Sequence, residues 1–227
     1  MMIRALLFVL VCVSGNVTAG VIDFDFESAM SVVTENTWTA GTDDLDTWYA
    51  PHSTNSSSEA AFSIENGVIN LDHDNRNHYR SMLYAIALPD AGTYELLLET
   101  LYSNYSNQLN YWQVFAANDG ATFNLRSLTW STVPTSATRL TRDYAPDDGS
   151  ENGVDFIGYS NEFSISEADF ASYDYLVLAL TGSRNSSQML QFDNLSISEV
   201  PEPGSLALCV VAALAMTGLR RRQNSKI

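Results

Sequence analysis

AFSIENGVINLD, residues 61–72, is the stretch that decides the fold class of this chain. Apolar residues alternate with polar ones on both sides of Asn66-Gly67, and alternation with a period of two is typical of a β-strand with one buried face. The Asn-Gly pair favours a tight turn, because both central residues of a type I′ turn need a positive φ. We therefore predict a β-hairpin at this point in the chain.

Similar alternation continues in both directions from this hairpin. VIDFDFE (21–27) places apolar residues against acidic ones, and residues 78–102 predict two strands around a Pro-Asp-Ala-Gly turn. Further strands are predicted at 111–117, 121–130, 154–160, 162–166, 173–182 and 189–198. About ten short strands and no long helical segment predict an all-β fold, an antiparallel β-sandwich of jelly-roll type similar to galactose-binding and carbohydrate-binding-module domains. Residues 39–59 and 131–153 are rich in polar and turn residues, and we expect two long loops there.

The N-terminal segment has the layout of a secretory signal peptide. Arg4 is followed by an apolar run and then by small and polar residues. Small residues precede the peptide bond between Ala19 and Gly20, which is the cleavage site that we predict. Residues 1–19 are then removed, and 20–199 form a single β-sandwich domain.

Charge and cysteine content narrow the class of this domain. Residues 20–199 contain six arginines, no lysine and 26 Asp or Glu, a formal charge of −20. So negative a surface repels phosphate backbones, which argues against nucleic-acid binding. Cys12 and Cys209 both lie outside the domain, so it has no disulfide, and this favours a bacterial exported protein stabilised by its core alone.

Residues 200–227 form a third segment with three parts. Pro201 and Pro203 end the last strand, because proline cannot continue a paired strand. The apolar run 206–219 would span roughly 21 Å as a helix, which is shorter than the roughly 30 Å hydrocarbon core of a bilayer. The basic tail 220–227 would hold the C-terminus on the cytoplasmic side. We expect a transient association with the inner membrane.

This C-terminal segment, VPEPGSLALCVVAALAMTGLRRR, resembles the PEP-CTERM sorting signal. The resemblance covers about 25 residues and rests on the order and spacing of three features. They are the motif Pro201, Glu202 and Pro203, the hydrophobic helix, and the cluster Arg220, Arg221 and Arg222. An N-terminal signal peptide accompanies this tail in such proteins, as it does here.

The resemblance implies a route and a destination for the protein. It implies export by the secretion translocon of a Gram-negative bacterium, followed by cleavage near the Pro-Glu-Pro motif by an exosortase, a membrane-embedded cysteine protease. Members of the family are delivered to the cell surface or released into extracellular polysaccharide, and are associated with biofilm formation. The alternative is an ordinary membrane anchor whose tail stays uncleaved.

Calcium is the metal that the sequence favours, because hard cations take several oxygen ligands. In jelly rolls of the carbohydrate-binding-module kind, a pair of polar residues on the last strand often meets acidic residues near the first strand. The sequence resembles that arrangement in Asp25 and Glu27 near the first strand and Asp193 and Asn194 on the last. The alternative is a hydrogen-bonded strand end without metal.

Sugar binding is the activity that the domain suggests most concretely. Sugars are held by aromatic faces that stack on their C–H groups, together with polar hydrogen-bonding side chains. Aromatic residues gather in two polar stretches of the sequence, where we expect them to be exposed. The candidates for a glycan-binding face are Trp38, Trp48, Tyr49, Tyr105, Tyr111 and Trp112. The alternative is that these rings form small clusters in the core, as we expect for Trp130.

We expect a non-enzymatic protein of the cell surface or extracellular matrix. Motifs of metalloproteases, serine hydrolases and P-loop enzymes do not occur in the sequence, and the domain has no cysteine nucleophile. A dedicated polysaccharide-binding lectin, with or without calcium, is the alternative function, and a divergent hydrolase is a third. Extracellular polysaccharide and the exosortase are the partners that follow from this interpretation.

Overall fold

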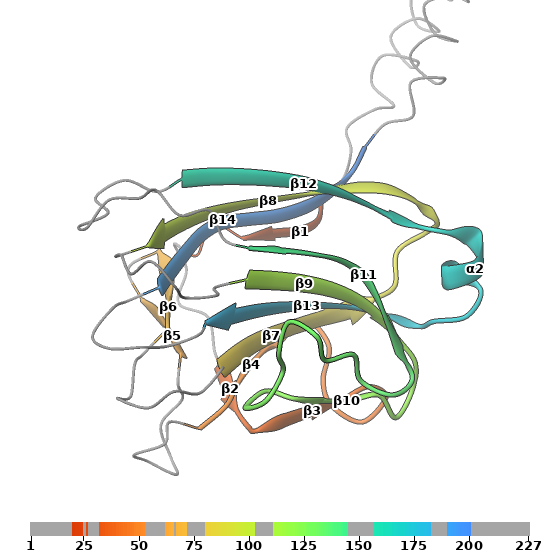
Figure 1. Cartoon of the computed structure of the whole chain (residues 1–227), viewed down its shortest axis with the longest axis horizontal. Helices are drawn as coiled ribbons and strands as arrows, with labels where there is room; N and C mark the ends of the chain where they lie inside the picture. Colours follow the sequence, from red (N-terminus) through yellow and green to blue (C-terminus); the bar gives the residue numbers. More distant parts are fainter. Residues whose placement is uncertain are drawn as a thin grey trace, which may run out of the picture.

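The computed structural model describes residues 20–24, 26, 32–52, 62–65, 67–71, 80–102, 111–144, 157–182 and 190–200. These residues form two six-stranded sheets and a separate two-stranded sheet. The predicted all-β sandwich of jelly-roll type is confirmed. Figure 1 shows the two large sheets as stacked layers, with the two-stranded sheet below them.

The first sheet has the strand order β12-β8-β14-β6-β5, and β1 also pairs with β14. Its strands are β1 (Gly20–Phe24), β5 (Phe62–Glu65), β6 (Val68–Leu71), β8 (Gly92–Tyr102), β12 (Ile157–Ile165) and β14 (Leu190–Glu199). The predicted hairpin is confirmed as β5 and β6, which pair from Phe62 opposite Leu71 to Glu65 opposite Val68. Gly67 takes a φ of 81°, as the turn requires.

The second sheet has the order β11-β9-β13-β7-β4-β2. Its strands are β2 (Val32–Thr34), β4 (Trp48–Ala50), β7 (Arg80–Ala87), β9 (Tyr111–Ala117), β11 (Ala137–Tyr144) and β13 (Tyr175–Gly182). Strands β3 (Thr37–Thr39) and β10 (Thr122–Asn124) form the small sheet, and a short helix, α2 (Glu167–Phe170), precedes β13. Among the described strands, only β2 and β4 pair in parallel.

Both expected loops contain strands, and two of the predicted strands are a single strand. The expected loop 131–153 contains the eight-residue strand β11, and the expected loop 39–59 contains β4. The separate strands predicted at 154–160 and 162–166 are one continuous strand, β12. Strand β11 lacked an apolar alternation because it is an edge strand whose first seven residues are all only partly buried.

The core lies in two layers, one on each side of the second sheet. Side chains from both large sheets meet between them, among them Leu96, Phe163, Trp112 and Leu178. A second cluster covers the other side of the second sheet. It includes Phe115 of β9, which packs against residues of β3, β10 and the segment that follows β10. The second sheet is therefore buried on both faces, whereas the outer face of the first sheet is open to solvent.

The sandwich has two ends, at which its strands begin or finish. The chain enters the domain through β1 and leaves it through β14 at the same end. Gly20 on β1 lies opposite Ser198 on β14, and the Val200 amide donates to the Thr93 carbonyl at 2.8 Å. We call this the terminal end. The opposite end is where β8, β11 and β13 finish and where β9, β12 and β14 begin (Figure 1).

Candidate functional site

The structure corrects the predicted sugar-binding aromatics. Five of the six rings are buried, with exposed fractions of at most 3%: Trp38, Trp48, Tyr49, Tyr111 and Trp112. A ring without an exposed face cannot stack on a sugar. The sixth residue, Tyr105, lies outside the described residues.

The local fold explains why these rings are buried. Trp48 and Tyr49 are neighbours on β4, whose three residues are all buried, so their side chains point into the two core layers on opposite sides of the second sheet. Trp112 and Tyr111 divide in the same way on β9. Trp38 belongs to β3, which closes the outer core layer against Phe123 at a ring distance of 5.7 Å.

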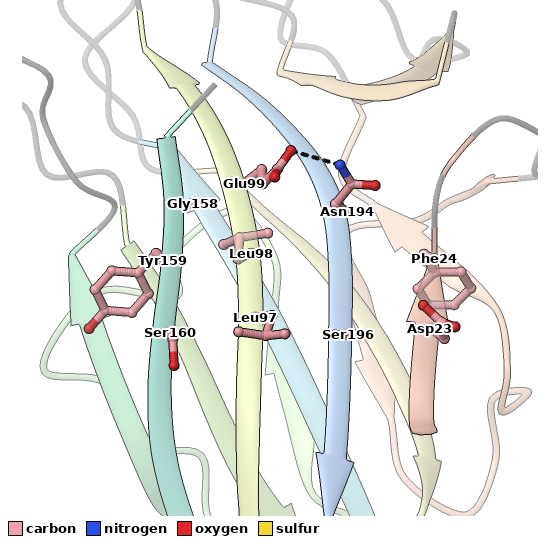
Figure 2. Close-up of a pocket in the computed structure, with 10 residues that line it drawn as sticks. All are labelled: Asp23, Phe24, Leu97, Leu98, Glu99, Gly158, Tyr159, Ser160, Asn194 and Ser196. Atoms are coloured by element: carbon pink, nitrogen blue, oxygen red, sulfur yellow. Dashed lines mark hydrogen bonds between the residues drawn. The ribbon is translucent and has the colours of Figure 1, made fainter. Parts of the chain in front are cut away.

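The open face of the first sheet carries a shallow hollow of about 370 Å³. Its lining comes from four adjacent strands, β12, β8, β14 and β1 (Figure 2). The lining residues are Asp23, Phe24, Leu97, Leu98, Glu99, Gly158, Tyr159, Ser160, Asn194 and Ser196. None of these four strands contains a lysine or an arginine.

Strand register brings the outward-facing lining residues together. Ser160, Leu97, Ser196 and Asp23 stand opposite one another in a single row across the four strands. Leu97 lies within this row and is 40% exposed. The row therefore places an apolar surface between hydroxyl and carboxylate groups.

A β-bulge shapes one side of the hollow. The register of β14 against β8 shifts between Asp193 and Ser196, and Asn194 within this bulge takes a φ of 45°. The Asn194 side-chain amide donates to Glu99 Oε2 at 2.7 Å (Figure 2), and the Asn194 backbone amide donates to the Asp193 carboxylate at 2.7 Å. These bonds hold the amide and the Glu99 carboxylate side by side on the open face.

The other side of the hollow is more open. Gly158, on β12, has no neighbouring heavy atom within 4 Å of the position that a Cβ would take. Next to it on the outer face, Ser160 donates a hydrogen bond to Glu95 Oε1. A small residue and a short hydroxyl side chain thus leave room beside Leu97.

Tyr159 joins the edge of the first sheet to the edge of the second. Its hydroxyl donates to the carboxylate of Asp143 on β11, and the side-chain amide of Asn161 donates to the Tyr159 oxygen at 3.0 Å. Burial is the main cause that raises the pKa of Tyr159 above its usual value, and the Asp143 charge adds to it. The phenol therefore stays protonated at neutral pH and joins β12 to β11.

The structure describes only half of the predicted calcium ligands. The first and last strands of the domain do meet, since β1 pairs with β14, and Asp193 and Asn194 lie in the bulge described above. Asp25 and Glu27 lie outside the described residues. Within the described part of the chain, no group of three or more His, Cys, Asp or Glu side chains is placed to hold a metal ion.

The sorting segments also lie outside the described residues. These are the signal-cleavage residue Ala19, the Pro201-Glu202-Pro203 motif and the arginine cluster. In the described ranges no helix is long and apolar enough to cross a membrane.

Comparison with known proteins adds little to this description. No protein-family model and no curated protein sequence matches the chain. One similar solved structure is a CBM4 module, with 9% identity over 71% of this chain and 92% of the module, and a TM-score of 0.47. A second is the CBM22-2 xylan-binding domain from Paenibacillus barcinonensis, with 10% identity over 79% of this chain and 99% of that domain, and a TM-score of 0.41.

A third similar structure is an enzyme. It is a cyclase from Fischerella sp. TAU, with 16% identity over 63% of this chain and 71% of the cyclase, and a TM-score of 0.40. At such identities and scores, none of these likenesses carries an argument about the ligand or activity of this chain. Its function has to be argued from its own residues.

Sequence reasoning missed the residues of the hollow except Asn194, which it assigned to calcium. Leu97, Glu99 and Ser160 occupy ordinary outward positions of alternating strands, and only their pairing across the sheet brings them together. The one signal in the sequence was the run Glu95 to Leu98, where three leucines follow one another and one of them has to face solvent.

Proposed function

We propose that this protein is an exported, non-enzymatic component of the cell surface or extracellular matrix, and that its domain binds a neutral polysaccharide in the hollow of the first sheet. The observation that carries the proposal is the open sheet face. One sheet is covered on both sides, whereas the other is hollowed and lined by hydroxyl, amide and carboxylate groups around the exposed Leu97.

The lining matches the chemistry of a sugar. A pyranose presents C–H groups on one face and hydroxyls around its rim, and each hydroxyl both donates and accepts hydrogen bonds. Leu97 offers an apolar contact to the C–H face. Ser196 and Asn194 offer donors and acceptors to the hydroxyls, and the Ser160 oxygen, whose proton is donated to Glu95, offers a further acceptor. A shallow surface without end walls suits a long chain better than a small molecule.

The charge of the hollow selects among sugars. Asp23 and Glu99 line it, Glu95 and Glu162 lie on the same outer face, and no basic residue occurs on the four strands. These carboxylates accept hydrogen bonds from hydroxyls but repel uronic acids and sulfated sugars. A neutral glycan is therefore the ligand class that we propose.

The termini support the remainder of the proposal. The signal peptide 1–19 and the PEP-CTERM-like tail 200–227 favour export through the translocon, transient anchoring in the inner membrane and cleavage by an exosortase. Mass spectrometry of the exported protein tests this. We expect a mature C-terminus near Pro201, and a full-length C-terminus after the Pro-Glu-Pro motif is replaced by alanines; an intact tail in the unaltered protein would favour a permanent anchor.

Calorimetry of the exported protein tests the glycan site. Neutral hexasaccharides such as cellohexaose, mannohexaose and laminarihexaose are titrated beside an oligogalacturonate. We expect saturable binding of a neutral sugar, no binding of the uronate, and a loss of roughly 10-fold or more in affinity for Leu97→Ala, because about 1.4 kcal/mol corresponds to a factor of ten.

Val133→Ala is the matched control. Val133 is also an exposed apolar residue, at 43%, but does not line the hollow, so its truncation should leave affinity unchanged. Repeating the titration with calcium and then with EDTA tests the proposed calcium at Asp25, Glu27, Asp193 and Asn194. Preference for the uronate, or equal effects of the two truncations, would contradict a neutral-sugar site at Leu97.

A further inference from the structure

Three side chains form a stack at the edge of the second sheet. They are Trp130 and two residues of β11, Arg142 and Tyr144. The rings of Trp130 and Tyr144 lie parallel, with centroids 4.1 Å apart and an interplanar angle of 6°. The Arg142 guanidinium carbon lies 4.1 Å from the centroid of the Trp130 ring. Since two groups this close cannot share one ring face, Tyr144 and Arg142 cover opposite faces of Trp130.

The stack is braced by the surrounding chain. Arg142 Nη1 donates to the Trp130 carbonyl, and Arg139 Nη2 donates to the Thr132 carbonyl at 2.6 Å. The Tyr111 ring meets Trp130 edge-on at 5.5 Å. These contacts fix Trp130 and hence the plane of the Tyr144 ring that packs on it.

Tyr144 ends the stack towards solvent. It is 40% exposed, and because Trp130 covers one face of its ring, we infer that the exposed part includes the other face. A flat aromatic face held in a fixed plane is suited to stacking on the C–H face of a sugar. It was not among the aromatics predicted for this role, because it ends a strand with no apolar alternation.

The stack and the hollow lie on opposite sides of the sandwich. Tyr144 pairs with Tyr111 across β11 and β9, and directly paired side chains share a face. On β9, Phe115 belongs to the outer core layer, and Tyr111, four residues before it, lies on the same side. Tyr144 is therefore on the outer side of the second sheet, whereas the hollow is on the outer side of the first.

We propose that the open face of Tyr144 is a second sugar-stacking site, and that one molecule joins two neutral polysaccharide chains, one on each side of the sandwich. This proposal rests on glycan binding as the proposed function, but the Tyr144 site does not depend on the hollow. Two sites facing away from each other are unable to hold the same short stretch of one glycan. The activity that results is cross-linking of a polysaccharide matrix.

Stoichiometry tests the proposal. In calorimetry with the neutral hexasaccharides above, we expect two sugars bound to each molecule of the exported protein. The number should fall to one in Tyr144→Ala and to one in Leu97→Ala, while Tyr144→Phe, which keeps the ring, retains two. Thermal melting of each variant shows whether it is folded.

Two further readouts separate a sugar site from a merely structural stack. Trp38, Trp48 and Trp112 are at most 1% exposed, so acrylamide quenching of the native protein reports chiefly on Trp130. A hexasaccharide bound on the outer face of Tyr144 should lower that quenching by covering the solvent side of the stack, and the decrease should be absent in Tyr144→Ala. Light scattering should show large complexes of the protein with soluble galactomannan, mixed-linkage glucan or laminarin, absent for either alanine variant.

The outcomes distinguish the two proposals. A stoichiometry of one that is abolished by Leu97→Ala but not by Tyr144→Ala overturns the second site and leaves the hollow intact. A stoichiometry of one abolished only by Tyr144→Ala overturns both cross-linking and the hollow. Absence of any neutral-sugar binding overturns the proposed function together with this inference.

Discussion

Truncation of Trp48 to alanine distinguishes a core ring from a binding platform. Trp48 is 1% exposed and contacts three other rings, those of Tyr84 at 5.0 Å, Phe24 at 5.6 Å and Phe26 at 6.2 Å. Replacing a buried Trp by Ala typically lowers the free energy of unfolding by about 3–5 kcal/mol. That is a large part of the roughly 5–15 kcal/mol that stabilises a typical domain.

Urea denaturation followed by circular dichroism measures this loss. With a denaturant slope of roughly 2 kcal/mol/M, the unfolding midpoint should fall by about 1.5–2.5 M. Trp48→Phe keeps an aromatic ring and is the control. Because Trp48 Nε1 has no hydrogen-bond partner among the described residues, we expect the control to lose no polar contact and to shift the midpoint by less than about 0.7 M.

A midpoint that moves by less than about 0.3 M in Trp48→Ala, together with lost sugar affinity, would refute the assignment of this ring to the core. If the large shift is found, any loss of binding in this variant reflects unfolding. Glycan binding then has to be tested at residues such as Leu97, whose truncation leaves no cavity because the side chain is already exposed.

Two further predictions concern alkaline pH and a strained turn. Burial raises the pKa of Tyr84 from 10.0 to about 12, and the charge of Asp46 adds to this effect. The neutral Tyr84 phenol therefore contributes its full stabilisation of the folded state below pH 10, and this contribution is lost as the pH rises from 10 to 12. We expect the loss to be about 1–2 kcal/mol after solvent screening. In urea melts at pH 9 to 12, Tyr84→Phe should reduce the slope of the unfolding free energy against pH. An unchanged slope would contradict this role of Tyr84. Gly41 has a φ of 80°, and a Cβ there would lie 2.4 Å from the Asp119 carboxylate oxygen that accepts a hydrogen bond from the Tyr175 hydroxyl. Gly120 has a similar φ of 78°, but its Cβ would meet nothing within 4 Å. Because Asp119 would have to move and give up that hydrogen bond, Gly41→Ala should cost about 1–2 kcal/mol more than Gly120→Ala. Equal midpoints for the two glycine variants in thermal or urea melts would exclude the contact with Asp119 as the cause.

The elements that the sequence predicted well are those whose pattern is local. The hairpin at β5 and β6 follows from its Asn-Gly turn, and β9 begins and ends where its apolar run does, at Tyr111 and Ala117. Strand β11 was missed because an edge strand needs no alternating apolar face, and its residues include Thr138, Arg139 and Thr141.

The site was harder to predict, because burial of a sheet face is a property of the whole fold. A polar stretch around Trp38 and Trp48 suggests exposed rings. However, β4 is a strand of the second sheet, which is covered on both faces, and β3 packs over the outer face of that sheet, so both rings are buried. Conversely, the leucine run 96–98 indicates only that one of its members faces solvent, and Tyr144 gives no local signal. Leu97 is exposed because the outer face of its sheet is uncovered. Tyr144 is exposed because it ends a stack on Trp130, which lies 14 positions earlier in the chain.

The position of β14 determines how the domain would respond to mechanical load. β14 lies inside the first sheet, with β8 on one side and β6 and β1 on the other, and the chain leaves it at Val200. A pull on the C-terminal segment acts along β14, perpendicular to the hydrogen bonds that join antiparallel strands. Those bonds then share the force and must break together, rather than one after another from an end. A sugar held in the hollow would pull on the same strand at Asn194, so tension between the polymer and the C-terminal segment, before the proposed cleavage, would be borne within one sheet.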